Sequence, residues 1–317
     1  MKPEILVITP IYGPTLAQLE RDYVVHRRWS AADPAALVRD IAPRVRALVS
    51  TGFVGFTRAD LDPLARLEIV ACFGNGHNTY DMAAAKERGI VVTNTPDRTS
   101  ETVAELAIAL LLAVSRRVAE SDRYVRAGRW KGGPGSFGLG HTLMGKRCGI
   151  VGLGSIGKGV ARRAEALGMS VSYHGPREKS GVPYRYYPSV LDMARDADAL
   201  VVACPLTPQT RALVDSHALA ALGASGYLVN VGRGPVVEQE ALLGALRDGR
   251  IGGAALDVYW NEPEVPPELK AMDNVVLVPH IGSSTTEIRE ERGEMLLENL
   301  RAHFAGEPVP NRVRAEG

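Results

Sequence analysis

Three side chains have the types needed for acid–base chemistry on a small organic acid: Arg233, Glu262 and His280. A guanidinium can hold a carboxylate through two parallel hydrogen bonds and polarise an adjacent carbonyl. A carboxylate beside an imidazole favours the imidazolium, so the histidine can donate a proton to a developing alkoxide. Together the three residues predict hydride transfer to a keto acid. Taken singly, Arg233 could form a structural salt bridge and His280 could be an ordinary packed histidine.

A glycine-rich turn has the pattern of a cradle for the dinucleotide that would supply the hydride. Gly152, Gly154 and Gly157 follow the apolar run 149–151 and open a helix. The first glycine permits a tight turn, the second lets a pyrophosphate approach the backbone, and the third lets helix and strand pack closely. Free N–H groups at the start of the helix would then meet the phosphates. The residues predicted to contact the cofactor here are Gly152, Gly154, Ser155, Ile156 and Gly157.

The residues after the next strand bear on the choice between NADH and NADPH. Sites for NAD usually have Asp or Glu at the end of that strand, where it binds the ribose hydroxyls, but this chain has His174. A 2′-phosphate would therefore meet no repulsion, and Arg177 could pair with it, assisted by Lys179. The sequence predicts NADP(H), with NAD(H) as the alternative if Glu178 reaches the ribose instead. The predicted contacts are His174, Gly175, Pro176 and Arg177.

Two series of alternating strands and helices would position these side chains. In the first, the predicted strands are Ile5–Thr9, Arg46–Ser50, Leu67–Cys72 and Ile90–Thr93, and the clearest helices are Thr15–Tyr23 and Tyr80–Arg88. In the second, the predicted strands are Cys148–Val151, Ser170–His174, Ala199–Ala203, Tyr227–Val231, Gly253–Val258 and Val275–Val278. This alternation implies parallel sheets with helical crossovers. The three chemical side chains each follow a strand, so we expect them at one edge of one sheet.

Helices connect and close the two series. One long apolar helix is predicted from Thr99 to about Val125, and a final helix from Thr285 to Phe304. Ser155–Leu167 and Gln239–Asp248 are the clearest helices of the second series. We therefore predict the α/β class, with two Rossmann-like parallel-sheet domains. Residues 98–284 would form a dinucleotide-binding domain inserted into a substrate domain made of residues 1–97 and 285–317.

Composition limits the kinds of partner. The chain has 317 residues, 45% of them hydrophobic and 23% charged, with a formal net charge of +1, so nucleic acid is not an expected partner. No apolar run predicts a signal peptide or a membrane span, so no membrane partner is expected. Cys72, Cys148 and Cys204 form neither a CxxC arrangement nor a zinc-binding pattern, so no metal is predicted. We expect a cytoplasmic protein with reduced cysteines.

The motifs around the candidate site resemble those of the D-isomer-specific 2-hydroxyacid dehydrogenase family. The resemblance covers nearly the whole chain and is densest from His141 to Ser284. The matching stretches are Val151–Gly157, Cys204–Thr210, Val229–Gly234, Ala255–Val258, Glu262-Pro263 and Val278–Gly282. By this resemblance, Arg233 binds the substrate carboxylate and carbonyl, and Glu262 pairs with His280, which is the acid and base.

The same resemblance implies further contacts with the cofactor. Asp257 would contact the nicotinamide amide. The cofactor channel would be lined by Cys204, Pro205, Thr210, Val231 and Gly232. The family is typically a homodimer joined through its nucleotide domains, so Trp130 could either reach a partner subunit or pack within its own.

The resemblance places part of the substrate site in the first domain. There a glycine-rich loop would hold the substrate carboxylate with backbone N–H groups, and the corresponding stretch is 74–78. The candidates on this loop are Asn75 and Gly76, with Gly52 and Phe53 forming the opposite wall. Arg233 and His280 would complete the substrate contacts.

We therefore predict an NADPH-preferring reductase of short 2-keto acids, with glyoxylate and hydroxypyruvate as leading substrates. A reductase of 2-ketogluconate or of an aromatic 2-keto acid is the first alternative. A corepressor-like protein that senses dinucleotide is a remote alternative, since fold alone does not fix function.

Overall fold

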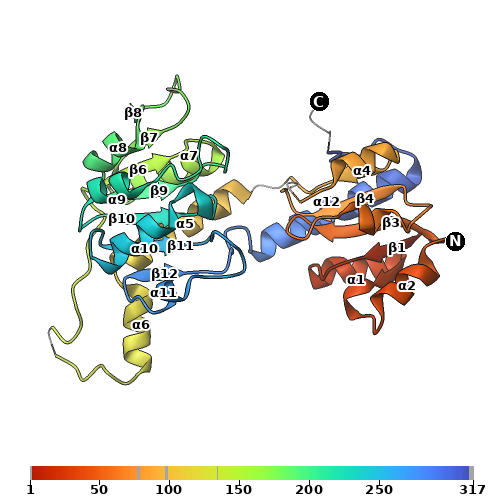
Figure 1. The fold of residues 1–317 in the computed structure, drawn as a ribbon, viewed down its shortest axis with the longest axis horizontal. Helices are drawn as coiled ribbons and strands as arrows, with labels where there is room; N and C mark the ends of the chain where they lie inside the picture. The colour runs from red at the N-terminus through yellow and green to blue at the C-terminus, as the bar shows by residue number, and fades with distance from the viewer. Residues whose placement is uncertain (1, 77–78, 97–98, 134, 314–317) are drawn as a thin grey trace. The chain divides into compact units, whose positions relative to one another are not determined.

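The computed structural model describes residues 2–76, 79–96, 99–133 and 135–313. The chain divides into two compact units: Met1–Arg98 with Thr285–Gly317 (unit 1), and Thr99–Ser284 (unit 2). Each unit is a parallel β-sheet covered by helices (Figure 1). The sequence-based boundaries at 97/98 and 284/285 fall at these divisions or one residue away. No helix in the described ranges is long and apolar enough to cross a membrane.

Unit 1 has a five-stranded sheet with the strand order β2-β1-β3-β4-β5. Its strands are β1 Glu4–Val7, β2 Val24–Arg27, β3 Val45–Thr51, β4 Ile69–Phe73 and β5 Val91–Thr93. Its helices are α1 Gly13–Asp22, η1 Arg28–Ser30, α2 Pro34–Ile41, α3 Arg58–Leu61, α4 Met82–Glu87 and α12 Thr286–Ala305. All five residues of β4 are buried, as expected for a strand with helices on both faces.

Unit 2 has a seven-stranded sheet with the order β12-β11-β10-β9-β6-β7-β8, the Rossmann arrangement. Its strands are β6 Arg147–Val151, β7 Ser170–His174, β8 Arg185–Tyr187, β9 Ala199–Val202, β10 Tyr227–Asn230, β11 Gly253–Leu256 and β12 Val275–Leu277. Its helices are α5 Thr99–Ser115, α6 Val118–Arg126, α7 Ser155–Ala166, α8 Val190–Asp196, α9 Ser216–Leu222, η2 Gly234–Val236, α10 Gln239–Arg247 and α11 Pro267–Lys270.

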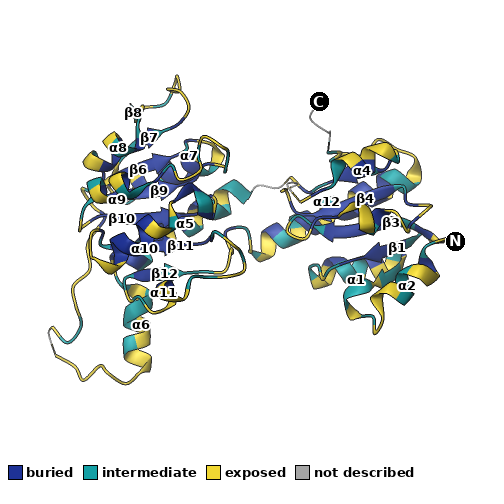
Figure 2. Ribbon diagram, in the orientation of Figure 1, coloured by how far each residue is buried: buried dark blue, intermediate teal, exposed yellow. Residues whose placement is uncertain are grey.

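Two hydrophobic clusters form the core of unit 2. Successive residues of a strand point to opposite faces, so Leu228 of β10 joins one cluster and Val229 joins the other. The central strands are buried throughout, which Figure 2 shows as dark blue arrows. The predicted α/β class with two parallel-sheet domains is therefore confirmed.

The single long helix predicted from Thr99 to about Val125 is wrong, because the structure has two helices there. α5 ends at Ser115 and α6 begins at Val118. Between them Arg117 takes a left-handed conformation, with a φ of 56°. Its guanidinium is held by the Glu120 carboxylate at 2.6 Å and lies over the Phe137 ring. These contacts stabilise a break that the continuous apolar pattern does not reveal.

The sequence also fails to predict two of the four edge strands, β2 and β8. None of the four residues of β2 is buried, and only Tyr187 of β8 is. An edge strand has neighbours on one side only, so it needs no continuous apolar run.

Candidate active site

The three candidate catalytic side chains all lie at the carboxyl edge of the unit 2 sheet. Arg233 follows the end of β10, Glu262 follows β11, and His280 follows β12. These three strands are adjacent and parallel, so their ends meet at one edge. The structure thus brings together the side chains that the sequence singled out.

The imidazole of His280 is bonded to the carboxylate of Glu262. Its Nδ1 lies 2.7 Å from Oε2 of Glu262. The other carboxylate oxygen, Oε1, accepts the backbone N–H of Tyr259 at 3.0 Å. The His280 side chain is 41% exposed, against 19% for Glu262. Because Nδ1 is engaged by Glu262, Nε2 is the nitrogen available to exchange a proton with a substrate.

Glu262 also sets the charge state of the pair. Its hydrogen bond to His280 raises the pKa of the imidazole, against the opposing effects of burial and of the Arg233 cation. Burial by itself would raise the pKa of Glu262, but hydrogen bonds from His280 and the Tyr259 N–H hold it below its usual range. The ionised pair is therefore favoured near neutral pH.

The backbone of His280 is in a conformation that few non-glycine residues adopt, with a φ of 54°. On its carboxyl side, Asp257 accepts the N–H of Ile281 at 2.6 Å and that of Gly282 at 3.0 Å. Asp257 is only 2% exposed, and this burial raises the pKa of its carboxyl. Asp257 therefore holds the loop that follows His280, a contact that the sequence did not predict.

Arg233 sits in a loop that its neighbours hold tightly. The amide of Asn230 donates to the Arg233 carbonyl at 3.1 Å and accepts the Gly232 N–H at 3.0 Å. A Cβ on Gly234 would lie 2.1 Å from the backbone of Tyr259, so only glycine fits there. The guanidinium itself is exposed and donates to the Gly232 carbonyl at 2.7 Å. This leaves further N–H donors free to bind a carboxylate.

The glycine-rich turn has the geometry that a dinucleotide needs. Gly152 has a φ of 99°, and a Cβ there would lie 2.6 Å from Cβ of Cys204. A Cβ on Gly157 would lie 2.1 Å from the Gly152 carbonyl oxygen. Gly154 is exposed, no atom lies within 4 Å of where its Cβ would be, and no side chain caps the start of α7. The uncapped first turn, which includes Ser155 and Ile156, fits a phosphate group.

The residues predicted to select the cofactor follow β7. The imidazole Nδ1 of His174 lies 3.0 Å from the Tyr187 carbonyl oxygen, while the His174 carbonyl accepts the Gly152 N–H at 2.9 Å. Gly175 is buried, whereas Pro176 and Arg177 are exposed. Within the described ranges Arg177 makes no ion pair, so its charge is available to an anionic ligand.

The remaining predicted cofactor residues cluster where β9 and β10 end. Cys204 lies against the turn at Gly152 and the turn at Gly232. A Cβ on Gly232 would lie 2.7 Å from the carbonyl oxygen of Cys204. Val231 is buried, and the hydroxyl of Thr210 donates to the Pro205 carbonyl at 2.7 Å, closing the loop after β9. Burial raises the pKa of the Cys204 thiol to about 11, which argues against a nucleophilic role.

The substrate residues predicted in unit 1 also lie together, on the loops after β3 and β4. The Gly52 N–H donates to the Phe73 carbonyl at 3.2 Å, and a Cβ on Gly52 would lie 2.9 Å from the Gly76 carbonyl oxygen. Asn75 and Gly76 are exposed, and the ring of Phe53 is 67% exposed. Residues 77 and 78 of the predicted loop lie outside the described ranges.

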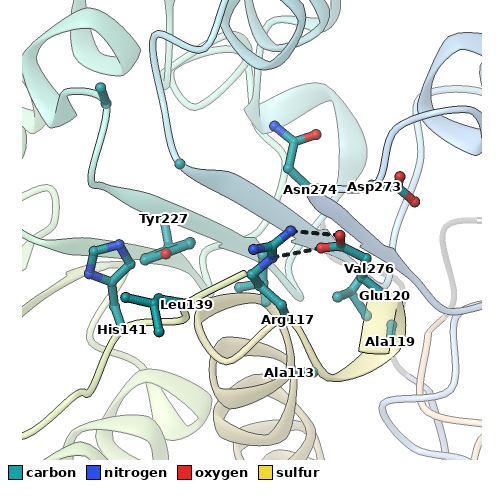
Figure 3. Close-up of a pocket in the computed structure, with 13 residues that line it drawn as sticks. Ala113, Arg117, Ala119, Glu120, Leu139, His141, Tyr227, Asp273, Asn274 and Val276 are labelled. Carbon is teal, nitrogen blue, oxygen red and sulfur yellow. Dashed lines mark hydrogen bonds and ion pairs between the residues drawn. The ribbon is translucent and has the colours of Figure 1, made fainter. Parts of the chain in front are cut away.

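A cavity of about 460 Å³ lies elsewhere in unit 2 (Figure 3). Its lining includes Arg117 with its partner Glu120, as well as Tyr227, Asn274 and Val276. Tyr227 is the first residue of β10 and Asn274 immediately precedes β12, so the cavity is at the amino edge of the sheet. It therefore contributes no residue to the candidate active site.

Comparisons with known proteins show the family of the chain. A family model described as D-isomer specific 2-hydroxyacid dehydrogenase, NAD binding domain, matches residues 108–282. The chain is 45% identical to glyoxylate/hydroxypyruvate reductase A of Arabidopsis thaliana over 305 residues, which are 96% of this chain and 97% of that protein. It is 43% identical to the hydroxyphenylpyruvate reductase of Plectranthus scutellarioides, with the same coverage of 96% and 97%.

A solved structure gives a similar result. The NADPH-dependent glyoxylate/hydroxypyruvate reductase of Sinorhizobium meliloti, in complex with NADP and malonate, is 38% identical with a TM-score of 0.84. The match covers 99% of this chain and 97% of that one. The likeness thus extends over both units.

Proposed function

Because the chain belongs to the family of D-isomer specific 2-hydroxyacid dehydrogenases, we propose that it reduces short 2-keto acids to D-2-hydroxy acids with NADPH. Glyoxylate and hydroxypyruvate are the leading substrates. The observation that carries this proposal is the 2.7 Å contact between His280 and Glu262, at the sheet edge that also bears Arg233. The likeness to reductases from Arabidopsis thaliana and Sinorhizobium meliloti supports the substrate and the cofactor.

The residues of the chain supply binding and a proton. When bound, NADPH provides the hydride that adds to the carbonyl carbon of the keto acid. The Arg233 guanidinium binds the substrate carboxylate and stabilises charge on the carbonyl oxygen. His280, held protonated by Glu262, donates its Nε2 proton to that oxygen, and the product is the hydroxy acid. Asp257 is proposed to contact the nicotinamide amide. The residues proposed to contact the substrate in unit 1 are Gly52, Phe53, Asn75 and Gly76.

The preference for NADPH is proposed to depend on Arg177. It is exposed without an ion pair in the described structure, and His174 leaves no carboxylate to repel a 2′-phosphate. Arg177→Ala should raise the KM for NADPH by about 10-fold while the KM for NADH changes little, because a charge-assisted bond of about 1.5–3 kcal/mol is lost. Lys131→Ala is a control, since this exposed cation lies on the loop after α6. An unchanged ratio of the two KM values would contradict the role of Arg177.

The function is tested by NADPH oxidation with glyoxylate, hydroxypyruvate, pyruvate, phenylpyruvate and 2-ketogluconate. We expect the highest kcat/KM with glyoxylate or hydroxypyruvate. His280→Ala should lower kcat by about 10²–10⁴-fold, because proton transfer contributes that much. His217→Ala is a matched control, since this exposed histidine lies in the first turn of α9. Absence of turnover with the whole panel would refute the proposed activity.

An aromatic 2-keto acid is a second candidate substrate. The Phe53 ring is 67% exposed beside the Gly76 loop of unit 1, where it could stack on an aromatic substrate. The 43% identity to a hydroxyphenylpyruvate reductase supports the same idea. A kcat/KM for phenylpyruvate above that for glyoxylate would favour this alternative.

We also propose a homodimer joined through unit 2 and a cytoplasmic location. Exposed apolar side chains on and after α6 support the dimer, namely Val118, Val125, Trp130 and Leu139. Three buried, unpaired cysteines agree with a reducing compartment.

A further inference from the structure

We propose that Tyr259 is a positioning residue that aligns the acid–base pair, holding Glu262 with its backbone and the turn into His280 with its hydroxyl. The inference rests on the proposed function only for its kinetic consequences. Tyr259 lies between the end of β11 and Glu262, and its side chain is 6% exposed.

Tyr259 contacts both members of the pair through different groups. Its N–H donates to Oε1 of Glu262 at 3.0 Å, and Oε2 of the same carboxylate meets the imidazole. Its hydroxyl oxygen lies 2.9 Å from the Val278 carbonyl oxygen and 3.3 Å from that of Leu256. A phenol has one proton to donate, so the shorter contact with Val278 is the principal bond.

The Val278 carbonyl is where the turn into His280 begins. It accepts the N–H of His280 at 3.1 Å as well as the Tyr259 hydroxyl. Immediately afterwards the chain adopts the φ of 54° at His280, and Asp257 fixes the two N–H groups that follow. A conformation of this kind persists only when the surrounding structure determines it. Tyr259 and Asp257 therefore hold the left-handed residue from its two sides.

The Tyr259 hydroxyl remains a donor over the working pH range. Burial, with the nearby carboxylates of Asp257 and Glu262, raises its pKa to about 12. Charged groups that face His280 are Glu262, Asp257 and Arg233. The Tyr259 hydroxyl bonds to none of these side chains in the described structure, so Tyr259→Phe acts on His280 only through the backbone.

The test is Tyr259→Phe, which keeps the ring in the core and removes the hydroxyl, with its principal bond to Val278 and its longer contact with Leu256. We expect kcat for keto-acid reduction to fall about 10-fold, less than the ~100-fold that an ångström of misplacement can cost. The KM for NADPH should stay within about twofold, since the glycine turn is untouched. The alkaline limit of kcat should move to lower pH, because a misaligned His280 bonds less well to Glu262, which then raises the pKa of the imidazole less.

A control separates this role from simple packing. Tyr227→Phe removes another buried phenol from the same unit, at the amino end of β10, and should leave kcat and its pH profile unchanged. Thermal unfolding of both variants shows whether each is folded. If Tyr259→Phe is folded and has the wild-type kcat and pH profile, or loses only thermal stability, the proposal is wrong.

A second measurement does not depend on turnover. The pKa of the His280 imidazole can be followed by NMR in the full chain, with His280→Ala used to assign the signal. Tyr259→Phe should lower that pKa relative to the wild type. An unchanged value would overturn the alignment role even if no keto acid proves to be a substrate, whereas a lowered value without turnover would leave the alignment intact and refute only the proposed reaction.

Discussion

At the scale of the residue, the proposed proton donor, His280, depends on its neighbour Glu262 for its charge. An isolated histidine is mostly neutral at pH 7, but reduction of a carbonyl needs the imidazolium. The hydrogen bond to Glu262 raises the pKa of His280 and keeps more of it protonated. The rate of reduction should therefore be full at low pH and fall as the pH rises through that raised pKa.

Replacement of Glu262 by Gln tests this directly. The amide can still accept a hydrogen bond but carries no charge, so the pKa of His280 should fall and the alkaline limit of kcat should move to lower pH. Glu264→Gln is the matched control, because this exposed carboxylate lies in the same loop and accepts from Asn261 at 2.8 Å. The pH dependence of kcat for the three proteins is the measurement. A profile that stays in place in Glu262→Gln would mean that the charge of Glu262 does not control His280.

The common position of the candidate catalytic residues could be predicted from the sequence, but the residues that hold them could not. Arg233, Glu262 and His280 each follow an apolar run, so their common edge can be deduced. Asn230 and Tyr259 act through bonds to the backbone of nearby loops. Such bonds depend on the folded path of the chain and have no characteristic spacing, so no pattern in the sequence indicates them.

At the scale of the element, the turn from β6 into α7 uses each glycine for a different purpose. Gly157 lets the helix approach the strand, since a Cβ there would lie 2.1 Å from the Gly152 carbonyl oxygen. Gly154 has open space around it, so its lack of a side chain is not needed for packing. Stability and cofactor binding should therefore depend on different glycines.

Alanine substitutions can separate these two requirements. Gly157→Ala should destabilise the protein by roughly 1–3 kcal/mol, the cost typical of overpacking, because backbone must move. Gly154→Ala should leave the free energy of unfolding nearly unchanged but weaken NADPH binding, since its Cβ would occupy the space for the pyrophosphate. Chemical unfolding and NADPH titration measure the two effects. Tight NADPH binding by Gly154→Ala would show that the pyrophosphate does not lie against this glycine.

The central strands of both sheets were all predicted, whereas two of the four edge strands, β2 and β8, were not. β9, β10 and β11 are buried at every position, so each appears as a continuous apolar run. The break between α5 and α6 is not indicated by any change in the apolar pattern. It depends on a left-handed Arg117 and on its contacts with Glu120 and Phe137. Local pattern thus indicates burial well and side-chain-stabilised breaks poorly.

At the scale of the whole molecule, the two units differ in how the chain builds them. Unit 2 is one continuous segment, Thr99–Ser284, whereas unit 1 needs both ends of the chain. The two hydrophobic clusters of unit 2 are made entirely from its own residues. It also contains the glycine turn, Arg177 and all three candidate catalytic side chains. Unit 2 therefore has what a separate folding unit requires.

A fragment of residues 99–284 should fold cooperatively and bind NADPH with a Kd within about 10-fold of the full chain, because a domain with its own core can fold alone. It should not reduce glyoxylate, since Gly52, Asn75 and Gly76 would be missing. Thermal unfolding, NADPH titration and a turnover assay beside the full chain test these expectations, and the fragment with Gly154→Ala is the control for binding. If a folded fragment reduces glyoxylate as fast as the full chain, the unit 1 loops are not part of the substrate site. A folded fragment that fails to bind NADPH would instead show that unit 2 alone does not complete the cofactor site.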